Sequence, residues 1–219
     1  VSKPLTSSAI ASVVGTGEVA WDSRIADLDP GFRLIQPWVS SQVTIRDLLS
    51  HRSGMPDHAG DLLEDLGYDR EEILYRLRFL EPSSSFRSQY AYTNFLFTEA
   101  GVAAARTLNT SWEDLVDARV FEPLGMTASS ARHADYLAAE NRASIHAIEN
   151  GEALARYDRN PDAQAPAGGV SSSARDMAKW LTLLINKGNF EGRQIIDGEA
   201  LGETFRPQIT SGTSHEDGR

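Results

Sequence analysis

Apolar residues recur along much of the chain at helical spacing, with charged and polar residues between them, which predicts a helix-rich fold. The stretch from Leu5 to Val14 is largely apolar and ends at a glycine-rich turn, so it predicts a buried helix. Residues 57–81 carry leucine and isoleucine at helical spacing and predict another helical segment. Residues 128–166 lack such a period and predict loops. Within them, Asn150-Gly151 favours the positive φ angles of a tight turn and predicts one short β-hairpin.

Further helices are marked by capping signals, in which a serine or threonine stands three residues before an aspartate. The hydroxyl group accepts a hydrogen bond from a free backbone amide of the first helical turn, which stabilises the start of the helix. Apolar residues follow each signal, so a helix is predicted after each of them. The pairs are Thr44 with Asp47, Ser111 with Asp114, and Ser173 with Asp176.

The polar residues Tyr92, Thr93 and Asn94 precede an apolar stretch that predicts a helix to about Leu108. Tyr92 and Asn94 are two positions apart at the helix start, so both side chains can project into one pocket while apolar residues are buried behind them. A phenol and a carboxamide on a rigid helix end suit acid–base chemistry. Tyr-x-Asn alone is a weak motif, and a tyrosine near a helix start is more often a core residue than a catalytic one.

Composition places the chain among globular proteins and argues against several functions. Of the 219 residues, 41% are hydrophobic, which supports a sizeable core. The formal net charge of −10 argues against a nucleic-acid partner, because no basic stripe is present to neutralise phosphates. Cysteine is absent and the five histidines lack metal-ligand spacing, so neither a metal nor another cofactor is predicted. No apolar run is long enough to span a membrane, and the oligomeric state is left open.

Lysine is rare in this chain. The 21 basic residues comprise three lysines, at positions 3, 179 and 187, and therefore 18 arginines. A guanidinium group cannot act as a base, whereas a buried ammonium group can lose its proton. Lys3, which stands far from the other two lysines, is therefore a candidate for proton transfer.

Four segments are informative as a set: 43–56 reads VTIRDLLSHRSGMP, 92–94 reads YTN, 123–127 reads PLGMT, and 167–177 reads AGGVSSSARDM. Together and in this order they resemble the class C β-lactamase-like family of serine hydrolases. This family belongs to the superfamily of β-lactamases and penicillin-binding proteins and includes esterases and D-amino-acid-specific peptidases. The resemblance extends over nearly the whole chain.

The resemblance implies an α+β fold class. The chain is expected to be the helical lobe of a serine β-lactamase-like fold, with most of the antiparallel sheet missing from it. Residues 1–219 are expected to form a partial β-lactamase-like, or transpeptidase-like, domain that is truncated at both ends. The first strands of such a sheet precede the Ser-x-x-Lys motif, and its later strands carry a Lys-Thr-Gly or His-x-Gly motif that is not recognisable here.

The chemistry that the resemblance implies is acyl transfer through a covalent serine intermediate, without a cofactor. Lys3 matches the lysine of Ser-x-x-Lys, and the matching serine falls one residue before Val1, since no Ser-x-x-Lys occurs within the 219 residues. Lys3 and Tyr92 are expected to share a proton, and Asn94 to orient Lys3 and bind substrate, so the catalytic candidates are Lys3, Tyr92 and Asn94. Either Lys3 or Tyr92 can be the base.

The expected substrate is a small-molecule ester, a β-lactam or a D-amino-acid peptide, and residues 57–81 are expected to cap the site and set substrate preference. The isolated chain is expected to be inactive, because it lacks the nucleophile. A non-catalytic binding or interaction protein on the same scaffold is the alternative. His51 lies in a segment that belongs to the scaffold in the family, so a hydrogen-bonded structural role is favoured over a role as catalytic base.

Overall fold

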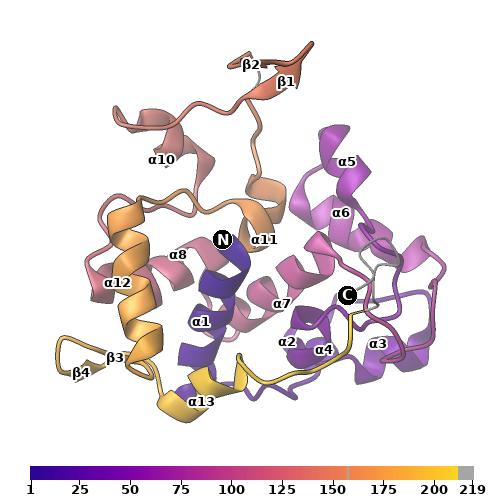
Figure 1. Ribbon diagram of the computed structural model, residues 1–219. Coiled ribbons are helices and arrows are strands. Elements are labelled where there is room, and N and C mark those ends of the chain that lie inside the picture. The colour runs from indigo at the N-terminus through magenta and orange to yellow at the C-terminus, as the bar shows by residue number, and fades with distance from the viewer. Residues whose placement is uncertain (157, 212–219) are drawn as a thin grey trace.

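The computed structural model describes residues 1–156 and 158–211, which form a helical body with two small β-hairpins (Figure 1). The α-helices are α1 (Ser2–Gly15), α2 (Ile25–Leu28), α3 (Pro37–Gln42), α4 (Ile45–Leu49), α5 (Asp61–Asp65), α6 (Arg70–Arg76), α7 (Asn94–Arg106), α8 (Trp112–Val116), α9 (Glu122–Leu124), α10 (His133–Ala138), α11 (Ala165–Gly168), α12 (Ala174–Ile185) and α13 (Gly198–Glu203). Single 3-10 turns occupy Leu77–Phe79 and Asp162–Gln164, and a π-helical turn occupies Asp117–Phe121. The predicted α+β class with a dominant helical lobe is confirmed.

Helix α1 lies at the centre of this body. Between Leu5 and Val13 every residue except Ser7 is buried, on all sides of the helix. A helix that is apolar or small all round is stable only when other elements surround it. Helices α7, α8, α11 and α13 pack directly against α1, and the indole of Trp180 on α12 donates a hydrogen bond to the Ser8 hydroxyl at 3.0 Å. The predicted buried helix is confirmed, and its first turn reaches the surface (Figure 1).

Helix α7 can lie close to α1 because its inner face carries small residues. Gly101 faces Thr6 on α1 and Trp112 on α8, and a Cβ atom at this position would lie 3.2 Å and 3.0 Å from atoms of those side chains. Alanines at 100, 103, 104 and 105 are also buried. Close approach of the two helices brings the start of α7 next to the start of α1.

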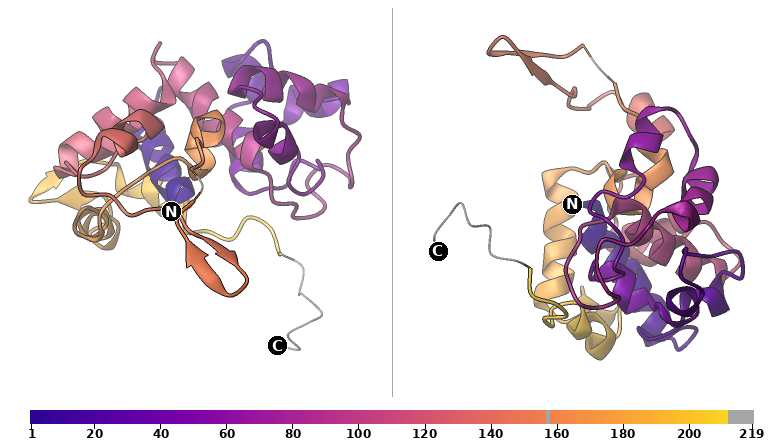
Figure 2. Two further views of the ribbon diagram at one scale, coloured as in Figure 1. Left: turned by 90° about the horizontal axis from the view of Figure 1, so that it is seen from above. Right: turned by 90° about the vertical axis from the view of Figure 1, so that its right-hand side faces the viewer.

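The predicted hairpin is confirmed. Strand β1 (Ala147–Glu149) pairs antiparallel with β2 (Glu152–Leu154), and the turn residues Asn150 and Gly151 have φ angles of 51° and 86°. Figure 2 shows this hairpin extending away from the helical body. A second pair, β3 (Asn189–Phe190) with β4 (Arg193–Gln194), lies beside α12.

Two sequence-based predictions are wrong in detail. Residues 57–81 hold two separate helices, α5 and α6, and a 3-10 turn, because Gly67, two residues after the end of α5, adopts a left-handed φ of 87° and ends that helix. Helix α10 occurs inside the segment predicted to be loops. It buries none of its residues, so the sequence carries no apolar stripe that would have indicated it.

The three capping signals are confirmed. Thr44 and Asp47 form a reciprocal capping box at α4. The hydroxyls of Ser111 and Ser173 accept hydrogen bonds from the backbone amides of Asp114 and Asp176, at 3.0 Å and 3.2 Å.

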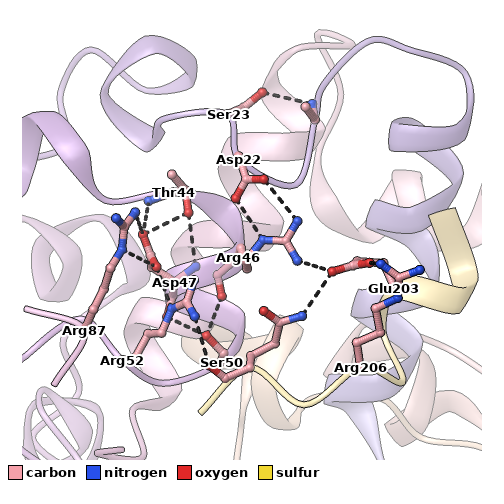
Figure 3. A network of polar contacts seen from close by, with 12 residues as sticks. Asp22, Ser23, Thr44, Arg46, Asp47, Ser50, Arg52, Arg87, Glu203 and Arg206 are labelled. Carbon is pink, nitrogen blue, oxygen red and sulfur yellow. Dashed lines mark hydrogen bonds and ion pairs between the residues drawn. The ribbon is translucent and has the colours of Figure 1, made fainter. Parts of the chain in front are cut away.

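Asp47 also anchors two loops of the molecule. Its carboxylate is fully buried and accepts hydrogen bonds from the Thr44 amide at 3.0 Å, from Arg52 Nε at 2.7 Å, and from Arg87 Nε and Nη2 at 2.9 Å and 2.7 Å (Figure 3). Burial by itself raises the pKa of Asp47, but the hydrogen bonds from Arg87, Arg52 and Thr44 outweigh it and lower the pKa below its ordinary value. The loops that follow α4 and precede Tyr92 are therefore tied to one carboxylate.

A second carboxylate near Asp47 makes a similar contact in a different environment. Asp22 accepts hydrogen bonds from Arg46 Nε at 2.8 Å and from Arg46 Nη2 at 3.1 Å. Arg46 also contacts Glu203 on α13 (Figure 3). The Asp22 side chain is 68% exposed, however, whereas that of Asp47 is fully buried.

We expect Asp47→Asn to destabilise the fold by about 3–5 kcal/mol, because it leaves two arginines without their buried partner. Asp22→Asn removes the same charge from an exposed carboxylate, and Arg46 keeps its contact with Glu203, so the cost is expected to stay below about 1 kcal/mol. Urea unfolding of the two variants and the parent chain measures both values. Equal costs for the two substitutions would contradict the anchoring role of Asp47.

Candidate active site

Lys3 projects from the first turn of α1 and joins three segments that are distant in sequence. Its Nζ donates hydrogen bonds to Asn94 Oδ1 at 2.7 Å and to the backbone carbonyl of Ala167 at 3.2 Å. Asn94 is the first residue of α7, and Ala167 belongs to α11. The side-chain arrangement follows from the packing of α1 against these two helices.

Tyr92 lies beside the same amine, but the contact differs from the hydrogen bond that the expected sharing of a proton between Lys3 and Tyr92 requires. Lys3 Nζ is 4.5 Å from the centroid of the Tyr92 ring and 5.3 Å from that of Phe97, which is cation–π geometry. Among the contacts of the described residues, none joins Lys3 to the Tyr92 hydroxyl. The structure therefore brings Lys3, Tyr92 and Asn94 together, with the amine over the face of the phenol ring. All three residues are partly exposed, so solvent reaches the cluster.

The environment shifts the pKa values of Lys3 and Tyr92 in opposite directions. Burial lowers the pKa of Lys3 from 10.5 to about 8, against the smaller raising effect of the Asp61 carboxylate. Burial, the neighbouring Tyr90 and Asp61 raise the pKa of Tyr92 above 10.0. Both shifts favour the neutral form, because charge is poorly solvated here. At pH 7 about a tenth of Lys3 is therefore an unprotonated amine.

Asp61 and His58 contact Asn94 and Tyr92, and the sequence did not indicate a role for either of them at this site. The Asn94 Nδ2 group donates a hydrogen bond to Asp61 Oδ2 at 2.9 Å, and His58 Nδ1 lies 2.8 Å from the same oxygen. The His58 amide donates to the Tyr92 carbonyl at 2.7 Å. Both residues lie within the PDHAGD segment at positions 56–61, where no spacing or periodicity distinguishes them from an ordinary loop.

His51 packs against the cluster and makes a hydrogen bond to its backbone, in line with its predicted structural role. Its Nδ1 accepts a hydrogen bond from the Thr93 amide at 3.2 Å, so Nδ1 is unprotonated in this contact. The ring centroid lies 4.7 Å from that of Tyr92 and 5.7 Å from that of Phe97. Burial, and then the charge of Lys3, lower the pKa of His51 to about 4.

A pocket of about 430 Å³ borders this cluster on the side of His51 and Tyr90. Residues from α1, from the end of α4 and from α13 line it together with the segment 206–211. The side chains of Lys3, Tyr92 and Asn94 are not part of its lining. Within the described residues, no group of three or more histidine, cysteine, aspartate or glutamate side chains is arranged to hold a metal ion, and no helix has the length and apolar character to cross a membrane.

The chain matches known proteins over nearly its whole length. The beta-lactamase family model matches residues 1–217. The chain is 30% identical over 184 residues to unguisins hydrolase ungD' of Aspergillus campestris, which covers 78% of this chain and 33% of that protein. It is 28% identical over 197 residues to penicillin-binding protein 4 of Amycolatopsis lactamdurans, which covers 86% of this chain and 50% of that protein. The crystal structure of a D-stereospecific amidohydrolase from Streptomyces sp. superposes with a TM-score of 0.79 at 19% identity, covering 95% of this chain and 64% of that one.

The fold and these matches define a β-lactamase-like class of protein. The chain belongs to the beta-lactamase family, as its sequence segments predicted. It spans between a third and a half of the length of the two curated relatives.

The low pKa of His51 predicts a specific pH dependence of stability. An unfolded histidine binds its proton near pH 6.5, whereas folded His51 binds it only near pH 4, so acidification between these values favours the unfolded state. We expect His51 to lower the free energy of unfolding by about 2 kcal/mol when the pH falls from 7 to 4.5.

The variant His51→Asn tests this contribution. Its oxygen can replace Nδ1 as acceptor, and asparagine tolerates the φ of 57° found at this position. Urea unfolding at both pH values is expected to show a smaller loss in His51→Asn than in the parent chain. His146→Asn, which alters an exposed histidine, is expected to leave the loss unchanged. The same loss in the parent chain and His51→Asn would contradict the assignment.

Proposed function

We propose that the complete protein is a serine hydrolase that forms a covalent acyl-enzyme, with Lys3, Tyr92 and Asn94 as its acid–base and orienting groups. The observation that carries this proposal is the Lys3 amine, held by Asn94 Oδ1 against the Tyr92 ring with a pKa of about 8. An amine with a pKa near the working pH can both accept and return a proton. A lysine that served only as a partner in an ion pair would not need a pKa low enough for part of its amine to be neutral.

The proposed reaction needs a serine three positions before Lys3, directly before Val1. Residues three apart on a helix lie on the same face, so a serine there would lie beside Lys3 if α1 continued by two residues, through Val1 to that serine. The alternative function, a non-catalytic binding or interaction protein on this scaffold, predicts another residue at that position. Reading the codon before Val1 separates the two.

In the proposed first step, the neutral amine of Lys3 takes the serine hydroxyl proton while the serine oxygen bonds to the substrate carbonyl carbon. The tetrahedral intermediate then expels the leaving group, which receives the proton from the Lys3 ammonium. Water attacks the acyl-enzyme in the same way and releases the acid. The opposite pKa shifts of Lys3 and Tyr92 favour Lys3 as the base and Tyr92 as a neutral hydrogen-bond donor.

Asn94 is proposed to hold the Lys3 amine through its oxygen and to contact the amide or ester group of the substrate. An ester or a D-amino-acid peptide is the preferred substrate class. The names of the similar proteins include a hydrolase of unguisins and a D-stereospecific amidohydrolase, which supports a range of acyl substrates on this fold. No residue of the matched segments is recognisable as dedicated to activating the deacylating water, which efficient β-lactam turnover needs.

We expect Lys3→Ala in the complete protein to lower kcat for p-nitrophenyl acetate by about 100-fold or more, because the base is lost. Lys179→Ala removes a lysine that binds the Gly125 carbonyl and serves as the matched control, with kcat unchanged. The 219-residue chain alone is expected to give no turnover. Steady ester hydrolysis by that chain, insensitive to Lys3→Ala, would refute the mechanism.

A separate assay tests the substrate class. The complete protein is expected to hydrolyse p-nitrophenyl acetate or a D-alanyl peptide faster than nitrocefin, and nitrocefin is expected to leave a long-lived acyl-enzyme detectable by mass spectrometry. Nitrocefin turnover far above that of the other two compounds would show that the enzyme is a β-lactamase.

A further inference from the structure

Asp61, at the start of α5, bridges the loop before that helix to the candidate active site. Its Oδ2 atom lies 2.9 Å from Asn94 Nδ2 and 2.8 Å from His58 Nδ1. A carboxylate only accepts hydrogen bonds, so His58 carries its hydrogen on Nδ1 in this contact. The His58 amide also holds the Tyr92 carbonyl. The segment 58–61 therefore contacts both residues of the Tyr-x-Asn motif.

The Asn94 carboxamide has two chemically different ends. Its oxygen only accepts hydrogen bonds and faces the Lys3 amine, while its NH2 group only donates and faces Asp61. Rotating the amide by 180° would place NH2 against the Lys3 ammonium and oxygen against the carboxylate. Both contacts would then join groups of the same kind, and both would be repulsive. The negative charge of Asp61 thus makes one of the two orientations strongly preferred.

We propose that Asp61 is a positioning residue that fixes the Asn94 carboxamide with its oxygen toward the Lys3 amine. The orientation itself is independent of any reaction. Its effect on turnover rests on the proposed function. Asp61 belongs neither to the four segments that resemble the family nor to the Tyr-x-Asn motif.

Asp61 also acts on Lys3 directly. Its charge raises the pKa of Lys3, in opposition to the larger effect of burial. Among the described residues, His51, which is neutral above about pH 4, and Tyr92, whose pKa is raised above its ordinary value of 10.0, also lie by the amine. His58 contacts the Asp61 carboxylate and the Tyr92 ring. Near neutral pH, the charge of Asp61 therefore opposes the effect of burial and keeps more of Lys3 in the protonated form. Its removal is expected to increase the neutral fraction of Lys3.

The first test follows Lys3 by NMR in the 219-residue chain labelled with 13C-lysine. Only three lysines are present, and Lys179→Arg and Lys187→Arg assign their signals by elimination. We expect Asp61→Asn to move the titration midpoint of Lys3 down by about half a pH unit or more. Asp65→Asn, which removes the same charge from an exposed position of α5, is expected to leave the midpoint unchanged.

The second readout is the side-chain NH2 group of Asn94 in a chain labelled with 15N-asparagine. One sharp pair of resonances is expected in the parent chain and in Asp65→Asn. In Asp61→Asn the pair is expected to shift and to broaden or double, because the NH2 group loses its carboxylate acceptor and the flipped orientation is then opposed by Lys3 alone. If Asp61→Asn does not fold, Asp61→Ser removes the same charge with a smaller side chain and gives the same readouts. An unchanged Lys3 midpoint or an unchanged Asn94 pair in the folded variant overturns the proposal.

In the complete protein, Asp61→Asn is expected to lower kcat by about 10- to 100-fold with KM changed less than about threefold, because Asn94 and Lys3 are misplaced rather than removed. The acidic limb of the kcat profile is expected to move to lower pH, and Asp61→Glu to recover part of the rate. A complete protein that hydrolyses none of the substrates refutes the proposed function, while the NMR results still decide the role of Asp61.

Discussion

The burial of α1 on all sides is the constraint on which the rest of the structure depends. Because nearly every residue from Leu5 to Val13 must be removed from water, helices from distant parts of the chain have to surround it. The start of α7 and the end of α11 meet at the exposed first turn as a result. Lys3 stands there, so one packing requirement produces both the core and the cluster that holds the amine.

Partial burial also gives the cluster its chemical character. Low polarity disfavours charge on Lys3, Tyr92 and His51 alike. It therefore lowers the pKa values of Lys3 and His51 and raises that of Tyr92, which favours the neutral form of each. The neighbouring cation lowers the pKa of His51 further. His51 therefore stays neutral and accepts the Thr93 amide, while Lys3 is left as the group whose protonation changes near neutral pH.

Two aspartates hold the surrounding loops, and they do so in different ways. Asp47 is fully buried between two arginines and stabilises the loops after α4 and before Tyr92. Asp61 is partly exposed and contacts a single amide of the cluster together with His58. The first contact serves mainly the fold. The second matters for the direction in which the Asn94 oxygen points.

The sequence by itself determined the central helix, the capped helices, the hairpin turn at Asn150-Gly151 and the family, because these depend on local periodicity, on hydrogen bonds within a few residues and on the order of short segments. It also singled out Lys3, Tyr92 and Asn94, which the structure brings together. Only the tertiary structure decided that the Lys3 amine lies over the Tyr92 ring, that Gly67 divides the segment 57–81, and that Asp61 contacts Asn94. Such contacts join elements far apart in the chain, and their geometry and pKa values depend on packing and burial that no local pattern records.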